Sequence, residues 1–333
     1  MFVYIIKRFF HLIPTLLGAT FLAFVISQLV PGDFLSELRL NPNVRPETIA
    51  RLERTYGLDL PWYQQYFKWM GNLLRLDLGV SFNNNQPVTD VITRPILNSL
   101  ILVGLATTLT YLLAIPLGVF SAVRQYSASD QIISAVSYFG LAIPNFFFAQ
   151  VLILCIFLFR TFTRETFGYN ELILPVAQMT SSNYEQLSSW GRFLDVLHHS
   201  LMPAFVIATG GIAGLTRILR GQMIEQLGTD YIRTARAKGL DERKVNYKHA
   251  LRIAIIPFVA TIGALLPSLI GGAGLVEVVV SWPGITPTLL GAIFGRDIYV
   301  VLGLLIISTL LLVIGNLISD ILLAAVDPRI RYS

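Results

Sequence analysis

Histidine and cysteine, which act as metal ligands and nucleophiles, are sparse in this chain. Its four histidines include one adjacent pair, His198 and His199. Neighbouring residues point to different sides of a helix, so this pair does not predict a metal site. The single cysteine, Cys155, lies in an apolar run and cannot form an internal disulfide. We therefore expect no catalytic residue and no metal site in this chain.

Two further sets of signatures are missing from the sequence. It contains no G-x-x-x-x-G-K-[ST] phosphate loop, and neither H-E-x-x-H nor C-x-x-C occurs. Its apolar runs are almost free of ionisable residues, which a proton-driven carrier or an intramembrane protease would need. The sequence therefore disfavours an autonomous pump or enzyme. A passive channel or secondary carrier stays open as an alternative of a different class.

The elements that would position any functional residue are membrane helices. The chain has 333 residues, of which 54% are hydrophobic and 14% charged, whereas soluble domains carry roughly 25% charged residues. Runs of about 20 apolar residues predict transmembrane helices. Six runs qualify: Leu12–Val30, Pro95–Val123, Gln131–Phe159, Val196–Thr216, Ile253–Val276 and Ile298–Ser319. We predict an all-α polytopic membrane protein with six transmembrane helices.

The basic residues predict the orientation of these helices. Taken together, residues 1–11, 124–130, 217–252 and 327–333 hold 14 Lys and Arg against 6 Asp and Glu, whereas the other connecting segments together are nearly balanced. Basic segments face the cytoplasm. Both termini are therefore predicted to be cytoplasmic, and the net charge of +5 reflects topology and does not indicate nucleic-acid binding.

The first external loop, Pro31 to Arg94, is long. Residues 46–56 predict a short polar helix with Pro46 at its start. Aromatic and apolar residues then recur at helical spacing, namely Trp62, Tyr66, Trp69, Met70 and Leu73. This pattern is typical of a helix at the membrane interface, and it would also suit a docking surface for a partner.

The segment between the fourth and fifth spans is basic and predicts two short helices. Thr229 to Lys238 forms the first helix, and Gly239 supplies its C-terminal cap. Asp241 caps the start of a second helix that runs through Arg252. Such an elbow on the inner face is suited to enter a groove on a partner protein. Anionic lipid headgroups are the alternative contact.

Glu277 is the only carboxylate in "GLVEVVVSWPGI", where the fifth span meets the outside. Its side chain would either extend to water or face a pore mouth or a seat for a binding protein, where it would meet a cationic group. In the second case, Glu277→Gln is expected to lower uptake and leave complex formation intact.

Several stretches resemble one family of transport proteins. "RTARAKGL" followed by "HALRIAIIP" resembles the EAA loop of ABC-importer permeases, with Arg233-Thr234-Ala235 in place of Glu-Ala-Ala. "KRFFHLIPTLLGATFLAFVISQLVPGD" and "YGLDLPWYQQYFKWMGNLLRLDLGVSF" resemble the opening and the external signature of the B-type permease subunits of dipeptide, oligopeptide and nickel importers. Leu76 stands where that family usually has Gly. The similarity covers nearly the whole chain.

This resemblance implies the partners and the sites. A second homologous permease, two cytoplasmic ABC ATPases that bind ATP and Mg²⁺, and an extracytoplasmic solute-binding protein would join this chain in the cell membrane. The elbow would couple the chain to the ATPases through Tyr231, Arg233, Thr234, Ala235, Lys238, Gly239, Leu240 and Asp241. The outer motif would form the pore mouth or the binding-protein seat through Glu277, Trp282, Pro283 and Gly284.

The resemblance also predicts the division of the chain and its cargo. Residues 1–98 would hold the first span and the external loop, and residues 99–333 would form a permease core of five spans. The cargo would be di- or oligopeptides, and nickel chelates, glutathione and oligosaccharides remain alternatives on the same architecture.

Overall fold

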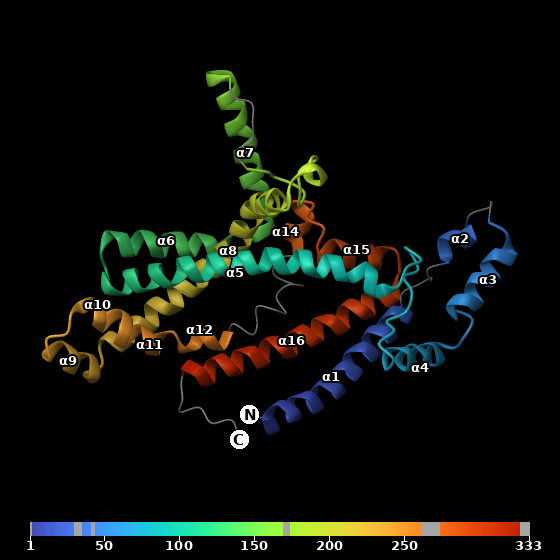
Figure 1. Ribbon diagram of the computed structural model, residues 1–333, viewed down its shortest axis with the longest axis horizontal. Coiled ribbons are helices and arrows are strands. Elements are labelled where there is room, and N and C mark those ends of the chain that lie inside the picture. The colour runs from blue at the N-terminus through green and yellow to red at the C-terminus, as the bar shows by residue number, and fades with distance from the viewer. Residues whose placement is uncertain (1, 30–34, 41–43, 169–173, 262–273, 327–333) are drawn as a thin grey trace. The chain divides into compact units, whose positions relative to one another are not determined.

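The computed structural model describes residues 2–29, 35–40, 44–168, 174–261 and 274–326, and these ranges are mainly helical (Figure 1). The chain divides into two compact units. The first unit comprises residues up to 97 together with 284–313, and the second comprises 98–283 together with the residues from 314. The predicted core of 99–333 thus contains one segment, 284–313, that the structure groups with the first unit.

The helices of each unit have the following bounds. The first unit holds α1 (Phe2–Leu29), α2 (Ser36–Leu40), α3 (Pro46–Tyr56), α4 (Trp62–Leu73), α15 (Ile285–Phe294) and the starts of α5 (Val88–Val123) and α16 (Ile298–Val326). The second unit holds the rest of α5 and α16, α6 (Ala128–Ala142), α7 (Asn145–Phe167), the short 3₁₀ helix η1 (Tyr184–Gln186), α8 (Ser189–Leu227), α9 (Asp230–Ala237), α10 (Glu242–Lys244), the π-helix η2 (Val245–Ala250), α11 (Leu251–Ala254), α12 (Ile256–Thr261) and α14 (Gly274–Val279).

Four helices of the described residues are long and apolar enough to cross a membrane, namely Val88–Val123, Asn145–Phe167, Ser189–Leu227 and Ile298–Leu323. The chain is therefore a polytopic, all-α membrane protein. Three predicted spans, 95–123, 196–216 and 298–319, lie inside these helices. The first predicted span lies in α1 apart from Val30, and much of the fifth, residues 262–273, lies outside the described residues.

The third predicted span, Gln131–Phe159, is not one helix, and its bounds were wrong. α6 ends at Ala142 and α7 begins at Asn145 (Figure 1). Between them Ile143 is extended, at φ −91° and ψ 123°, because the ring of Pro144 excludes the α conformation from the preceding residue. A run without charged residues indicates that a segment is apolar, but it does not show where a helix is interrupted.

Within the first unit, α4 packs one face against α1. Tyr66 and Trp69 are buried, and the Tyr66 hydroxyl lies 3.2 Å from the hydroxyl of Thr20 on α1. The Trp69 indole N–H donates to the carbonyl oxygen of Leu78 at 3.2 Å. The opposite face leaves Phe67 exposed, which is compatible with either predicted role, an interfacial helix or a docking surface.

Two local predictions in the external loop can be compared with the structure. The predicted helix over 46–56 is confirmed as α3, with Pro46 at its first turn. Leu76, which stands where the resembling family usually has Gly, adopts φ +62°. This left-handed conformation costs an L-residue roughly 1–2 kcal/mol and costs glycine little. A glycine at this position would therefore adopt the observed backbone with less strain than Leu76 does.

Candidate functional site

The turn that ends α9 has the hydrogen bonds of a Schellman motif. The N–H of Gly239 donates to the carbonyl of Arg236 at 2.9 Å, and the N–H of Leu240 donates to that of Ala235 at 3.3 Å. Gly239 has φ +74°, which glycine adopts without steric cost. The predicted helix cap at Gly239 is therefore confirmed.

The second arm of the elbow begins at the predicted residue. The Asp241 carboxylate accepts a hydrogen bond from the N–H of Arg243 at 3.1 Å. Across the turn, Arg236 Nε and Glu242 Oε1 form an ion pair at 2.9 Å. Both of these side chains are exposed, so the pair contributes little stability and the two caps define the turn.

This second arm is not the continuous α-helix that the sequence predicted. α10 covers only Glu242–Lys244, η2 winds as a π-helix over Val245–Ala250, and α11 follows. A π-helical turn contains an additional residue, so the segment is wider than an α-helix. Asn246 is buried inside η2. The prediction was right that the arm is helical and wrong about its winding.

One side of the elbow is buried in an apolar cluster, which we call the inner cluster. Its buried members come from α5, α8, α9, η2, α11 and α12: Val119, Ala122, Leu219, Met223, Ile232, Ala235, Val245, Ala250, Ala254 and Phe258. α9 contributes Ile232 and Ala235, which are three residues apart and therefore share one helix face. The elbow is thus anchored by apolar burial and is not a mobile loop.

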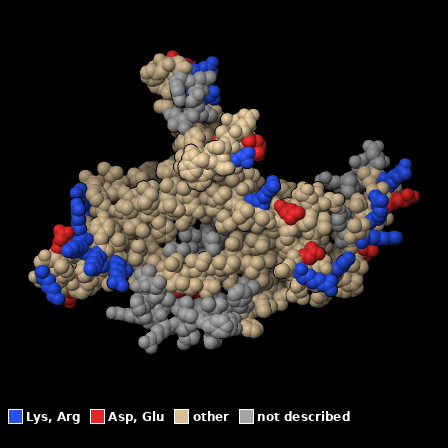
Figure 2. Space-filling model, in the orientation of Figure 1, with Lys and Arg blue, Asp and Glu red and all other residues tan. Residues whose placement is uncertain are grey.

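The other side of α9 is exposed and polar. Of the eight predicted coupling residues, seven are exposed: Tyr231, Arg233, Thr234, Lys238, Gly239, Leu240 and Asp241. Ala235 is the exception, because it is only 7% exposed and packs in the inner cluster. Figure 2 shows the lysine and arginine side chains that gather at this end of the second unit, over the elbow. The structure therefore leaves seven of the predicted residues exposed on the elbow and places Ala235 in the inner cluster.

Sequence reasoning missed an ion pair close to this surface. Asp130, in the first turn of α6, is 2% exposed and binds Arg220 of α8. The two residues are 90 positions apart, and each looked like an ordinary charge at the inner end of a span. One signal was available, because Asp130 is the only carboxylate of the short 124–130 segment.

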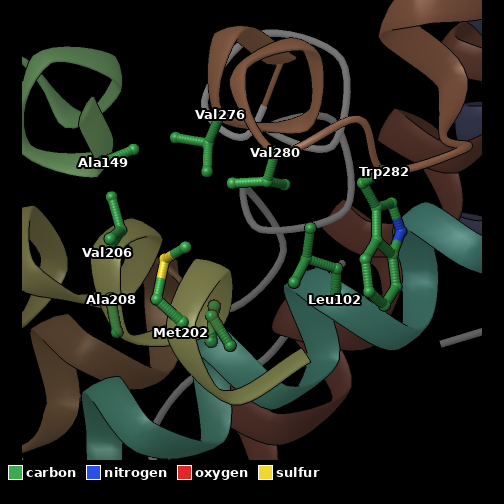
Figure 3. Packing of buried hydrophobic residues seen from close by; sticks show 10 residues of the cluster. Leu102, Ala149, Met202, Val206, Ala208, Val276, Val280 and Trp282 are labelled. Atoms are coloured by element: carbon green, nitrogen blue, oxygen red, sulfur yellow. The ribbon is translucent and has the colours of Figure 1, made fainter. Parts of the chain in front are cut away.

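The outer motif is held to α5 by hydrogen bonds, and we call this group the outer clamp. Glu277 on α14 is fully buried and accepts a hydrogen bond from the hydroxyl of Ser99. The Trp282 indole N–H donates to the carbonyl oxygen of Asn98 at 3.1 Å, and the Asn98 amide donates to that of Pro283 at 2.8 Å. In Figure 3, Trp282 lies along α5 near Leu102.

The outer clamp changes the interpretation of Glu277. Neither Glu277 nor Trp282 has exposed surface, and Gly284 is also buried, so only Pro283 of the four predicted outer residues is accessible. The expectation that Glu277 extends into water is therefore wrong. Its predicted contact with a cationic group at a pore mouth or binding-protein seat would require the outer clamp to open.

No group of three His, Cys, Asp or Glu side chains gathers as a metal site would within the part of the chain that the structure describes. His199 instead lies with its Nδ1 2.8 Å from the carbonyl oxygen of Asp195 in the preceding turn of α8.

Comparison with known proteins identifies the family. Residues 114–332 match the family described as "Binding-protein-dependent transport system inner membrane component", and residues 1–103 match its N-terminal companion. The chain is 40% identical over 333 residues to the oligopeptide transport system permease protein AppB of Bacillus subtilis (strain 168), covering 100% of both chains. It is 33% identical over 337 residues to the dipeptide transport system permease protein DppB of Escherichia coli (strain K12), covering 100% of this chain and 99% of that protein. It is 35% identical over 340 residues to the di/tripeptide transport system permease protein DppB of Pseudomonas aeruginosa (strain UCBPP-PA14), again covering 100% and 99%. The chain therefore belongs to the family of binding-protein-dependent transport system inner membrane components.

Proposed function

We propose that this chain is the permease subunit of an ATP-driven importer of di- or oligopeptides. It forms half of the translocation path and pairs with a second, homologous permease. Two cytoplasmic ATPases bind ATP and Mg²⁺ and hydrolyse the ATP, and an extracytoplasmic protein delivers the peptide. Membership of the family and the names of the three full-length relatives support this assignment.

The observation that carries the proposal is the construction of the elbow. Most of its exposed residues are polar or charged, with Leu240 as an exposed apolar exception, while Ile232 and Ala235 hold α9 in the inner cluster. A helix that presents one polar face on a rigid anchor can enter a groove on another protein and transmit displacement. We therefore assign the elbow, residues 229–252, as the contact with the ATPases.

The energy needed to switch the pore also favours entry through the elbow. Moving a pore from 1:99 to 99:1 between two states requires about 5.5 kcal/mol of differential interaction. A proton-driven cycle would need ionisable groups at membrane depth, and the predicted spans contain almost none. The free energy of ATP hydrolysis must then enter from a separate subunit through an exposed inner surface, and the elbow is suited to receive it.

The proposal includes six spans and cytoplasmic termini. The excess of Lys and Arg in residues 1–11, 124–130, 217–252 and 327–333, counted together, supports this orientation. Single cysteines placed at Ser127 and Ser182, in a background where Cys155 is replaced by serine, would test it. A membrane-impermeant maleimide added to intact cells should label Ser182→Cys only, and labelling of Ser127→Cys would overturn the orientation.

The contact with the ATPases is tested by charge reversal on the elbow. Arg233 is exposed and, among the residues that the structure describes, pairs with Asp230 on its own helix, so Arg233→Glu leaves the inner cluster intact. We expect the tagged variant to retain the second permease and to lose the ATPases on purification. Arg75→Glu, which reverses an exposed arginine of the external loop, is the matched control and should retain both partners. Retention of the ATPases by Arg233→Glu and Arg233→Glu/Lys238→Glu would overturn the assignment.

The cargo is tested by uptake into cells that carry the transporter genes or lack this chain. Labelled dialanine and trialanine should accumulate only when the chain is present, and unlabelled peptides should compete. Competition by a nickel–histidine chelate, glutathione or raffinose, without competition by peptides, would assign a different cargo to the same machine.

A further inference from the structure

Asp130 is bound by three groups from separate parts of the second unit. Arg220 forms two parallel hydrogen bonds with its carboxylate, Nε to Oδ1 at 2.7 Å and Nη2 to Oδ2 at 2.8 Å. The hydroxyl of Ser121 also donates to Oδ1, and the N–H of Tyr126 donates to Oδ2 at 2.9 Å. A paired fork of this kind fixes both distance and angle. We call these four residues the inner latch.

The inner latch joins three helices at one level. Ser121 belongs to the end of α5, Tyr126 to the connecting loop, Asp130 to the start of α6, and Arg220 to α8. Helices α5 and α8 are in close contact beside it, since a Cβ added to Gly118 would lie 2.8 Å from the Cβ of Leu219. The inner ends of α5, α6 and α8 are thereby fixed to one another.

The inner latch is also adjacent to the anchor of the elbow. Ser121 stands between Val119 and Ala122, and Arg220 follows Leu219, and these three neighbours belong to the inner cluster that buries α9. α9 begins at Asp230, soon after α8 ends at Leu227. A displacement of the elbow therefore reaches the inner latch through packed side chains and a short length of chain.

A buried ion pair is weak evidence for stability, because an apolar pair of similar volume stabilises a fold as well or better. Its distinctive property is orientation, since the guanidinium fork accepts one arrangement of the carboxylate. Asp130 stays ionised, because Arg220, with Ser121 and Tyr126, holds the pKa of that carboxyl well below its usual range despite its burial. The arrangement thus persists through the whole physiological pH range.

We propose that Asp130 and Arg220 are positioning residues that make the inner ends of α5, α6 and α8 move with the elbow as one body. Without the inner latch, the elbow contacts α5 and α8 through apolar packing alone, which can slide, so its displacement is passed on to α5 and α6 only in part. This proposal rests on the proposed function of the elbow. It predicts uncoupling: ATP is hydrolysed without a proportional amount of transport.

The test uses the whole transporter, with both permeases and both ATPases, reconstituted in proteoliposomes. The binding protein is added on the side of the membrane opposite the ATPases. Dialanine uptake and ATP hydrolysis are measured together for wild type, Asp130→Asn, Arg220→Lys and Ser121→Ala. Asp130→Asn and Arg220→Lys should lower dialanine taken up per ATP at least about fivefold, the low end of typical coupling between sites. Ser121→Ala, which keeps the fork, should lower it less.

Arg217→Gln is the matched control, because Arg217 lies on the same helix, is exposed and stacks over Tyr138 outside the inner latch. It should keep the wild-type ratio. A purely structural pair would reduce the amount of assembled complex and leave uptake per ATP unchanged in Asp130→Asn and Arg220→Lys, which would overturn the proposal. If Asp130→Asn fails to assemble, the ratio measured for Arg220→Lys decides. Absence of ATP-dependent uptake by the wild-type complex would instead overturn the proposed function.

Discussion

At the residue scale, two groups of buried polar side chains join helices that are far apart in the sequence. Glu277 and Ser99 join α14 to α5, and the inner latch joins α6 to α8. The side chains of Glu277, Ser99, Ser121 and Asp130 are buried, so removing one partner costs more than the net strength of the bond. Single substitutions at such positions are therefore informative about which helices must move together.

Ser99→Ala tests whether the outer clamp holds the structure together. The substitution removes a buried hydrogen bond to Glu277, which should cost about 1–3 kcal/mol of unfolding free energy. Thermal unfolding of the purified complex should therefore occur at a lower temperature, while dialanine uptake per assembled complex stays near wild type. Ser182→Ala, at an exposed serine of the external segment, should leave the unfolding temperature unchanged. Loss of uptake at an unchanged unfolding temperature would point to a direct role in transport.

Replacing Leu76 by glycine should raise the stability of the folded chain. Its φ of +62° strains an L-residue, and its side chain is exposed, so Leu76→Gly relieves strain without removing packing. We expect a gain of up to about 1 kcal/mol, because the greater freedom of glycine in the unfolded chain offsets part of the relief. Leu74→Gly is the matched control, since Leu74 is exposed at a right-handed φ of −62°, and it should destabilise the complex. Equal effects of the two substitutions on the unfolding temperature would contradict the strain argument.

The inner latch has a defined dependence on pH. Because Arg220 lowers the pKa of Asp130 in the folded chain, the stabilisation is complete above the unfolded pKa of about 3.9 and is lost as pH falls below it. The difference in unfolding temperature between wild type and Asp130→Asn should therefore be constant from about pH 8 to 5 and shrink below about pH 4. A difference that changes between pH 8 and 6 would implicate another titrating group.

At the element scale, the elbow is built from signals that are local in sequence. Gly239 supplies a left-handed cap and Asp241 a side-chain cap, and each acts within a few residues of its own position. The short helix, the turn and the start of the second arm could therefore be predicted. The π-helical winding of η2 could not be predicted, because the amino-acid composition of this segment does not differ from that of an α-helix. Two of its residues, Val245 and Ala250, pack in the inner cluster.

Long-range pairing was the other limit of prediction. The contact of Asp130 with Arg220 and the contact of Ser99 with Glu277 join residues that are 90 and 178 positions apart. Hydropathy locates the membrane-spanning helices along the sequence, but it does not show which helix faces contact one another. The burial of Ala235 has the same origin, since its exposure follows from which side of α9 faces α5 and α8.

Gly239→Pro tests the turn as an element. Proline has no N–H to donate to Arg236 and cannot adopt φ +74°, so the Schellman motif is lost. We expect the permease pair to assemble, since the spans are unchanged, and transport to be uncoupled from ATP hydrolysis or abolished. Gly239→Asn is the control, because asparagine tolerates the left-handed region and a Cβ here meets no atom within 4 Å. Wild-type uptake by Gly239→Pro would refute the assignment of the elbow.

At the scale of the whole molecule, the chain has helices suited to cross a membrane, an exposed inner elbow and no phosphate loop. The family to which it belongs depends on a separate binding protein by its description. On the proposed function, this chain supplies half of the translocation path and the elbow that contacts the ATPases. The ATPases supply the free energy, and the binding protein delivers the cargo.

Reconstituted alone, the chain should neither hydrolyse ATP nor accumulate dialanine in a proton or sodium gradient. Adding the second permease and both ATPases should produce ATP hydrolysis, and adding the binding protein loaded with dialanine should stimulate that hydrolysis and give uptake. Liposomes that contain the two permeases without ATPases are the control for leakage. Uphill uptake by the single chain would reassign it to the secondary carriers.

The alternation of buried and exposed residues along α9 has a consequence for how such machines diversify. The helix has eight residues, and only Ile232 and Ala235 are committed to the interior. The others are free to vary in charge and shape without disturbing the membrane part. On the proposed function, a few substitutions on the exposed face of α9 would thus adapt the chain to a different ATPase and leave the packing of the membrane helices unchanged.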